Sequence, residues 1–306
     1  DYTQPLPDRE QALRYWHGNV HHSANRWFDK SIQLVVSHQG AHLGLIGEHS
    51  MADGMPAVGF CEYLMEREKL ADDVHDDGSA SSPGSGVHVT NIFADAMAPG
   101  KLGTEEYRHI LQRVNEAREH MTQRIQDLDL DTLTYQGYGS NAIKQAGYSP
   151  DAYVQMAMQV ASYRVFGKAV GTYEALQTRP FLHGRTETAR SVSTASAAFC
   201  EAMGPAVATT VDEGALAKKR SLLQAAVDAH SQYSRSGSEG LGVDRHFFGL
   251  SMLVAEGEAA PDLFFHPLFL RSKRWRMSTS TLPNVAPGFG PVEEDGVGVA
   301  YDLRPE

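Results

Sequence analysis

Residues 149–176 read SPDAYVQMAMQVASYRVFGKAVGTYEAL, and this stretch decides the fold expected of the chain. Ser149 can cap the first free N–H groups of a helix, and Pro150 fits the first helical position. Asp151 would favour the positive end of the same helix. The residues that follow are apolar on almost every side, which is typical of a helix in the centre of a protein. We therefore expect a buried central helix over this stretch.

Strands and other long helices are expected on both sides of this helix. Residues 104–129 carry apolar side chains at intervals of three and four, which predict an amphipathic helix, and Pro56 fits the first turn of another. Helices also fit 212–233 and 244–256, and the acidic, then Ser/Gly/Pro-rich residues 72–86 predict a solvated linker. Strands are expected at 32–37, 43–47, 87–93, 133–138, 277–281 and 297–303. The alternation of strands and helices predicts an α/β or α+β protein.

The composition of the chain argues against several classes of protein. The chain has 306 residues, of which 42% are hydrophobic, so it can bury a large core. Its formal charge of −11 disfavours general binding to nucleic acid, although a local basic pocket for an anion stays open. No apolar run is long enough to predict a membrane-spanning helix, and residues 1–11 are not typical of a signal or transit peptide. Cys61 and Cys200 have no CxxC partner, so we expect a reduced intracellular setting without a zinc site or disulfide framework.

The first chemical candidate is a short polar loop, GEHSMADGMP, at residues 47–56. His49 could take a proton from a hydroxyl or thiol near neutral pH if its second ring nitrogen is held. Asp53 could support the loop or the charged imidazole, and Gly54 permits backbone shapes that bring the ring to a cleft wall. The simpler alternative is a hydrogen-bonded structural histidine.

A second candidate is MSTST at 277–281. Because side chains alternate along a strand, Ser278 and Ser280 share one face and Thr279 lies on the other. The two serines could stabilise an oxyanion, or they could be ordinary exposed hydroxyls. No GxSxG motif accompanies them, which disfavours a serine nucleophile.

Arginines and one aromatic residue supply the remaining candidates. GRTETARS at 184–191 and DRHFFG at 244–249 each fit a capped helix or an arginine paired with an acid. Together they could bind a carboxylate, because guanidinium forms a planar fork onto two oxygens. Phe289 lies between glycines and could pack in the core or hold a quaternary ammonium. Two pairs of histidines spaced four residues apart lack an HEXXH motif, so ordinary surface or packing roles are favoured over a metal site.

Several separated segments resemble one family, the choline/carnitine O-acyltransferases. These segments occur in the family's order across nearly the whole chain. They are NRWFDKSIQLVV (25–36), GEHSMADGMP (47–56), SPDAYVQMAMQ (149–159), GTYEA (171–175), GRTETARS (184–191), DRHFFGL (244–250), STSTL (278–282) and GFGPVEEDGVGVAYD (288–302). The resemblance implies a carnitine O-acyltransferase, an enzyme that moves an acyl group reversibly between acyl-CoA and the hydroxyl of carnitine.

The resemblance also implies roles for the polar residues. His49 matches the family's general base, and Asp53 matches the acidic position of the same loop. Ser278 and Ser280 match the STS motif, whose second serine contributes to the oxyanion site. The reaction then needs no metal and no acyl-enzyme, and coenzyme A acts as a co-substrate rather than a permanently bound cofactor.

Substrate-binding positions follow from the same resemblance. Tyr173, Thr186 and Arg245 match those that hold the carboxylate of carnitine, which favours carnitine over choline. Phe289 matches the aromatic position near the trimethylammonium. The loop at 47–56 resembles that of fungal short-chain enzymes, which favours acetyl or short-chain transfer, although STSTL and PGFGPV also resemble longer-chain members. The residues that match the coenzyme A region are Lys144, Ser149 and Asp151.

The implied fold is the two-layer α+β fold of chloramphenicol-acetyltransferase relatives, with two similar domains. Residues 1–92 would be the final part of the domain that carries the catalytic histidine. Residues 93–306 would be the second acyltransferase domain, without the family's last strand and helix, and the remaining half would come from the parent chain. The family also implies a mitochondrial or peroxisomal protein, with the cytoplasm as an alternative.

Two other functions stay open. A related acyltransferase could release a carrier-bound polyketide chain to another alcohol. Because half of the family's reaction tunnel would be missing, the chain could also be a catalytically silent binding module.

Overall fold

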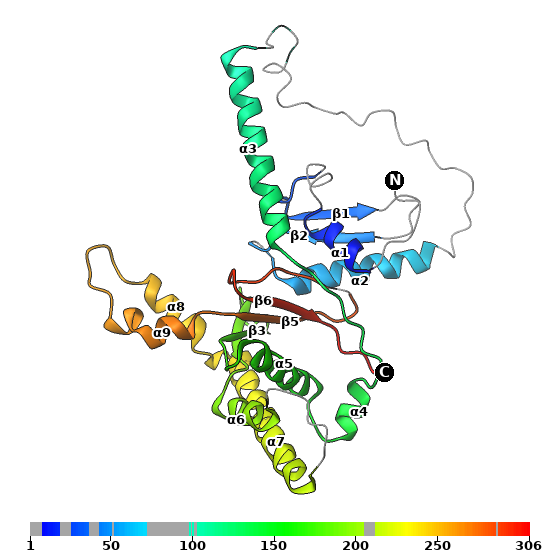
Figure 1. Cartoon of the computed structure of the whole chain (residues 1–306), viewed down its shortest axis with the longest axis vertical. Coiled ribbons are helices and arrows are strands. Elements are labelled where there is room, and N and C mark those ends of the chain that lie inside the picture. The colour runs from blue at the N-terminus through cyan, green and yellow to red at the C-terminus, as the bar shows by residue number, and fades with distance from the viewer. Residues whose placement is uncertain are drawn as a thin grey trace. The chain divides into compact units, whose positions relative to one another are not determined.

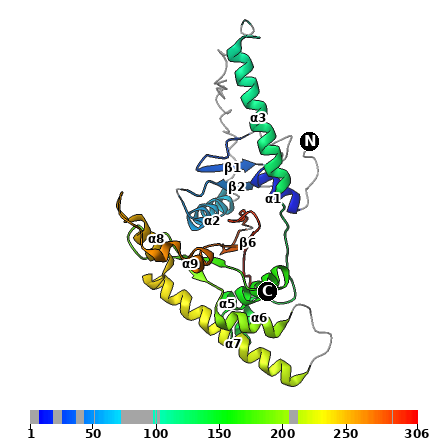
Figure 2. The same cartoon turned by 60° about the vertical axis from the view of Figure 1, so that its left-hand side comes forward.

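A computed structural model describes residues 8–18, 26–36, 43–50, 52–71, 98, 100, 103–204, 212–285 and 287–306 (Figures 1 and 2). The chain divides into two compact units, Asp1–Ala52 with Gly59–Leu133, and Asp53–Val58 with Thr134–Glu306. The predicted linker, the strand after it and the predicted domain boundary lie outside the described residues, so the assignment to two acyltransferase domains stays a prediction. Among the described residues, no helix combines the length and the hydropathy of a membrane-spanning segment.

The first unit contains a β-hairpin. β1, Ile32–Val36, pairs antiparallel with β2, Leu43–Gly47, which confirms both predicted strands. α1, Asp8–Trp16, packs on this hairpin, because a Cβ at Gly44 would lie 3.0 Å from the ring of Tyr15. The missing side chain of the glycine therefore lets an aromatic ring lie flat against the strand.

Two long helices also contribute to the first unit. α3 spans Glu105–Asp127, which confirms the predicted amphipathic helix. Its start is fixed by Thr104, whose hydroxyl accepts a hydrogen bond from the N–H of Tyr107 at 3.2 Å. α2 spans Gly54–Ala71, and its first turn belongs to the second unit.

The second unit is built on a mixed four-stranded sheet with the strand order β4-β3-β5-β6. β4 is antiparallel to β3, whereas β3, β5 and β6 run parallel. The strands are β3, Thr172–Gln177; β4, Thr186–Arg190; β5, Met277–Thr281; and β6, Val297–Tyr301. The strands predicted near the end of the chain are confirmed, although the last one stops at Tyr301.

Helices cover one face of this sheet. α5, Pro150–Phe166, lies beside the strands, and α6, Thr194–Met203, and α7, Glu213–Ser236, pack against α5 (Figure 1). Their shared core includes Met156 and Phe199. The other elements are α4, Ser140–Gln145; η4, Gly237–Leu241; α8, Asp244–Met252; η5, Asp262–Phe265; and α9, Pro267–Ser272. This mixture of helices and sheet confirms the mixed α/β class.

The helix predicted over residues 149–176 is correct only in its first part. α5 ends at Phe166, because Gly167 adopts the left-handed conformation with φ of 70° and closes the helix. The chain then returns as β3. A Cβ at Gly171 would lie 2.3 Å from the carbonyl oxygen of Arg274, so this glycine allows the close approach that starts the strand.

Two other predictions of secondary structure are wrong, and the helix predicted at 244–256 is correct only in its first part. No strand forms at 133–138, where Leu133 is 90% exposed, and none of the described strands pairs with this segment. The helix predicted at 244–256 stops at Met252. Most of GRTETARS forms β4, so its interpretation as a capped helix is also wrong.

Candidate active site

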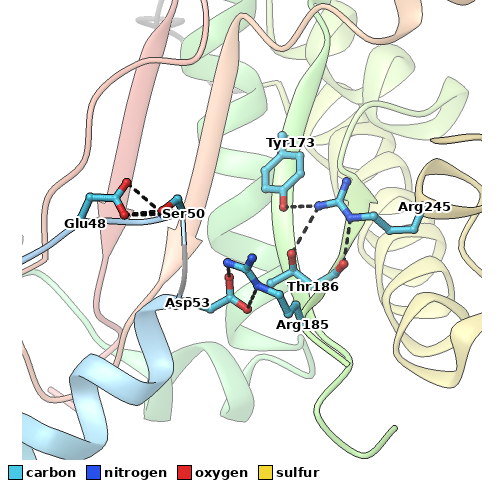
Figure 3. A network of polar contacts seen from close by, with 7 residues as sticks. All are labelled: Glu48, Ser50, Asp53, Tyr173, Arg185, Thr186 and Arg245. Atoms are coloured by element: carbon cyan, nitrogen blue, oxygen red, sulfur yellow. Dashed lines mark hydrogen bonds and ion pairs between the residues drawn. The ribbon is translucent and has the colours of Figure 1, made fainter. Parts of the chain in front are cut away.

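The loop that holds His49 begins with a turn closed by Glu48. The Glu48 carboxylate accepts hydrogen bonds from the Ser50 N–H at 3.1 Å and from the Ser50 hydroxyl at 2.5 Å (Figure 3). These bonds, helped by the charge and N–H of His49, lower the pKa of Glu48 below its ordinary value of 4.5. His49 itself is exposed at a bend. His49 is therefore not buried in a core.

Asp53 pairs with Arg185 within the second unit. Arg185 donates from Nη2 to Oδ1 at 2.9 Å and from Nε to Oδ2 at 3.3 Å (Figure 3), and this pairing raises the pKa of Arg185. At the next residue, a Cβ on Gly54 would lie 2.8 Å from Cδ2 of Leu282, so the glycine lets the start of α2 approach the end of β5. Asp53 and Gly54 thus anchor the end of the loop to the sheet.

Arg245 reaches two strands of the sheet from the first turn of α8. Its Nε donates to the Thr186 carbonyl oxygen at 3.0 Å, and its Nη2 donates to the hydroxyls of Tyr173 at 3.1 Å and Thr186 at 3.3 Å (Figure 3). The carboxylate of Glu187 accepts the backbone N–H of Arg245 at 3.3 Å, which holds the first turn of α8. The structure therefore brings together the three residues predicted to hold a carboxylate.

The guanidinium of Arg245 differs from those of the two arginines in GRTETARS in the acceptors that it contacts. Arg190 donates to both oxygens of Asp244 at 2.6 and 2.9 Å, and Arg185 is bound to Asp53 in the same bidentate way. For these two arginines the simpler interpretation, pairing with an acid, is confirmed. Within the described part of the chain, by contrast, the Arg245 guanidinium has only neutral oxygens as acceptors. It can therefore offer its charge to an anion.

The predicted serines lie on the same sheet face as Tyr173. In the sheet register Tyr173 lies beside Ser278, and Ser278 lies beside Gly298. Paired residues on neighbouring strands point to the same face, so Tyr173, Ser278 and, two residues further on, Ser280 share one face. Thr279 points to the opposite face, as the alternation along the strand predicts.

The segment around Phe289 crosses this face at Gly298. A Cβ on Gly298 would lie 2.8 Å from the carbonyl oxygens of Phe289 and Gly290. Only a residue without a side chain permits this approach. The half-buried Phe289 therefore lies in a segment that borders the face of Tyr173 and Ser278.

Comparison with known proteins identifies the family. The whole sequence, residues 1–306, matches the family described as Choline/Carnitine o-acyltransferase. The chain belongs to this family. The choline/carnitine acyltransferase resemblance carried by the sequence motifs is thereby confirmed.

Individual relatives include both carnitine and choline enzymes. The chain is 35% identical to carnitine O-acetyltransferase of Mus musculus over 289 residues, which cover 93% of the chain and 43% of that relative. It is 34% identical to the mitochondrial carnitine O-acetyltransferase of Saccharomyces cerevisiae over 306 residues, or 99% and 43%. It is 32% identical to choline O-acetyltransferase of Rattus norvegicus over 312 residues, or 99% and 46%. The chain thus spans less than half the length of these relatives, and their similar identities do not separate carnitine from choline as acceptor.

The residues predicted to bind coenzyme A in this acyltransferase chain lie on α4 and at the start of α5. Lys144 is exposed in the last turn of α4, and Ser149 is exposed at the N-cap of α5. Ser149 makes no capping bond with its side chain, so the predicted cap is wrong and its hydroxyl is available to a ligand. Asp151 is instead engaged with the sheet, because it accepts a hydrogen bond from the Tyr301 hydroxyl at 2.6 Å.

The structure also contains a buried polar cluster that the sequence analysis missed. His230 Nε2 lies 2.6 Å from Glu174 Oε2, and burial raises the pKa of Glu174 although His230 opposes the shift. Asp151 completes a group whose three potential ligand atoms lie within 4.8 Å of one another. Two of these three atoms, His230 Nε2 and Glu174 Oε2, are already partners in the same hydrogen bond. The signal that could have indicated an inward-facing Glu174 is the alternation of side chains along the strand. Glu174 shares its face with Thr172 and Leu176, which are both buried.

The spaced histidines add no site in the described residues. His17 is buried, and its Nδ1 lies 2.8 Å from the carbonyl oxygen of Gly18. His21, His22, His38 and His42 lie outside the residues that the structure describes.

Proposed function

We propose that this protein is a carnitine O-acyltransferase, which moves an acyl group reversibly between coenzyme A and the hydroxyl of carnitine. Membership of the family supports acyl transfer as the reaction class. The observation that carries the choice of acceptor is the Arg245 guanidinium, which is held by Tyr173 and Thr186 and is paired with no carboxylate of the described residues. Carnitine has a carboxylate that can bind this charge, whereas choline has none.

The reaction needs a base and an oxyanion site. The His49 imidazole takes the proton from the carnitine hydroxyl as the hydroxyl oxygen attacks the thioester carbonyl. The Ser280 hydroxyl then donates a hydrogen bond to the oxyanion of the tetrahedral intermediate. Collapse of the intermediate breaks the carbon–sulfur bond, and the imidazolium gives its proton to the sulfur of coenzyme A. The reverse reaction follows the same steps from the thiol.

Carnitine binding uses the sheet face described above. The carboxylate binds Arg245, and the trimethylammonium lies against the aromatic ring of Phe289, which attracts cations. Ser278 lines the same face beside Tyr173. Asp53 acts through Arg185 by holding the end of the His49 loop.

Coenzyme A binds at the junction of α4 and α5 in this proposal. Lys144 supplies a positive charge for a phosphate, and the free hydroxyl of Ser149 supplies a hydrogen bond. Asp151 supports this region through its bond to Tyr301.

We assign to the chain the two-layer fold of chloramphenicol-acetyltransferase relatives. Residues 1–92 are then the end of the domain that carries His49, and residues 93–306 belong to the second domain. The sheet of the second unit, covered on one face by α5, supports this assignment.

The decisive experiment is an acyl-transfer assay on the full-length protein that contains this chain. Initial rates are measured with carnitine or choline as acceptor and with acyl-CoA donors of increasing chain length. We expect a higher kcat/KM with carnitine, and higher rates with acetyl and short-chain donors. Equal or better transfer to choline would refute the assignment of the acceptor.

A further inference from the structure

A single buried glutamine in α5 connects several strands of the sheet in the second unit. Gln155 is fully buried. Its Nε2 donates to the hydroxyl oxygens of Thr279 in β5 and Tyr301 in β6, each at 3.0 Å. Its Oε1 accepts a hydrogen bond from the hydroxyl of Ser191, the residue after β4, at 3.0 Å. One amide thus contacts β5, β6 and the end of β4.

Thr279 extends this connection to β3. Its hydroxyl accepts from Gln155 and donates to the carbonyl oxygen of Tyr173 at 3.0 Å. Because both functions of the hydroxyl are used, its rotamer is fixed, and the buried bonds strengthen one another in a medium of low dielectric constant. The threonine between the two serines therefore ties their strand to the strand of Tyr173.

The position of these bonds in the sheet gives them a function. The parallel pairing of β3 with β5 covers three residue pairs, and Glu174 with Thr279 is the last of them. Ser280 follows immediately, beyond the residues that pair with β3. Ser280 still pairs with Ala300 of β6, so its connection to the strand of Tyr173 passes through Thr279 and its contacts.

We propose that Gln155 is a positioning residue, which acts through Thr279 to set the location of the Ser280 hydroxyl relative to the carboxylate site on β3. This inference rests on the proposed function, in which Ser280 binds the oxyanion. Gln155 lies on the opposite face of the sheet from that serine, so it contacts neither substrate. Its effect should therefore appear in the chemical step rather than in the binding of carnitine.

The same helix offers a matched control. Gln159 lies one turn further along α5, is also buried and donates from Nε2 to the Thr172 hydroxyl at 3.0 Å. Gln155→Met and Gln159→Met each remove one buried amide at nearly constant volume. Only Gln155→Met removes a bond to β5.

The experiment compares steady-state kinetics of both variants in the full-length protein, corrected for the folded fraction. Because a displacement of about 1 Å can reduce a rate roughly 100-fold, we expect Gln155→Met to lower kcat about 10- to 100-fold. The KM for carnitine should change little, and Gln159→Met should keep the wild-type kcat. Adding Thr279→Val to Gln155→Met should lower kcat much less than the product of the two single effects, because both changes break the same connection.

Three results would overturn the inference. They are a wild-type kcat in Gln155→Met, an equal loss of kcat in Gln159→Met, and multiplicative effects of Gln155→Met and Thr279→Val. A wild-type protein that transfers no acyl group to carnitine would instead refute the proposed function, and this inference with it. The two failures are thus distinguished by the activity of the wild type.

Discussion

Replacement of Arg245 by asparagine tests the acceptor site. Asparagine carries no charge and is too short to take the place of the guanidinium beside Tyr173 and Thr186. The bond between Glu187 and the backbone N–H of residue 245 does not depend on the side chain, so the first turn of α8 should persist. The change therefore removes the cation and leaves its surroundings in place.

The size of the effect follows from the hydrogen bonds of Arg245. Nε and Nη2 donate to Thr186 and Tyr173, and no acceptor for Nη1 lies among the described residues. Nη1 therefore has two N–H groups for a carboxylate. A hydrogen bond to a charged group contributes roughly 1.5–3 kcal/mol, and exposure of the arginine favours the lower end. One or two such bonds correspond to a rise of about 10- to 150-fold in the KM for carnitine.

The assay measures kcat and KM for carnitine and choline in parallel. Choline lacks the carboxylate, so its kinetics should change little in Arg245→Asn. Arg179→Asn is the matched control, because Arg179 is an exposed arginine in the segment after β3. A rise in the carnitine KM below about threefold, which is less than 1 kcal/mol, would refute the carboxylate site. A parallel rise for choline would do the same.

His49→Ala should abolish nearly all acyl transfer but leave carnitine binding by calorimetry largely intact, and a wild-type rate would disprove the assignment of the base. Ser50→Ala should raise the pKa of Glu48 towards 4.5, because it removes the Ser50 hydroxyl bond, the largest cause of the lowering, while the N–H bond from residue 50 stays. Since the folded-state pKa of Glu48 is lowered, its stabilising effect is present above pH 4.5 and is lost as pH falls through the folded value. In the variant this effect should be smaller and its loss should be complete at a higher pH, and an unchanged carboxyl NMR titration would contradict the prediction. Gly298→Ala should destabilise the protein by roughly 1–3 kcal/mol in urea unfolding, because its Cβ would meet the Phe289 carbonyl. Gly288→Ala, whose Cβ meets nothing within 4 Å, is the control, and equal stability of the two variants would count against the close approach.

Local patterns predicted those elements whose periodicity is unambiguous. The intervals of three and four in α3 and the alternation of serines in β5 each fit one type of structure. Residues 149–176 were different, because an apolar run does not distinguish a buried helix from a buried strand. Gly167 decides where the helix ends, and the close approach at Gly171, which depends on a carbonyl far along the chain, allows the strand to begin.

The candidate site was predictable in its residue types but not in its pairings. The sequence indicated arginines that could bind a carboxylate, yet it could not say which of them has an acid as partner. Arg185 meets Asp53 across 132 positions, and Arg190 meets Asp244 across 54. No rule of local spacing reaches that far. The buried pair of Glu174 and His230 was missed for the same reason, because 56 positions separate its members.

Two neighbouring residues at the start of α8 have opposite electrostatic roles. Asp244 neutralises Arg190 with two short bonds, and that arginine also donates to the Ser272 carbonyl oxygen and lies 4.7 Å from the Trp275 ring centroid. Arg245, the next residue, has neutral oxygens as its acceptors within the described chain. Neutral acceptors fix the direction of a guanidinium without cancelling its charge, whereas a carboxylate does both. Arg190 therefore serves to hold α8 on the sheet, and this fixed helix start is what lets Arg245 keep a free charge at a defined position.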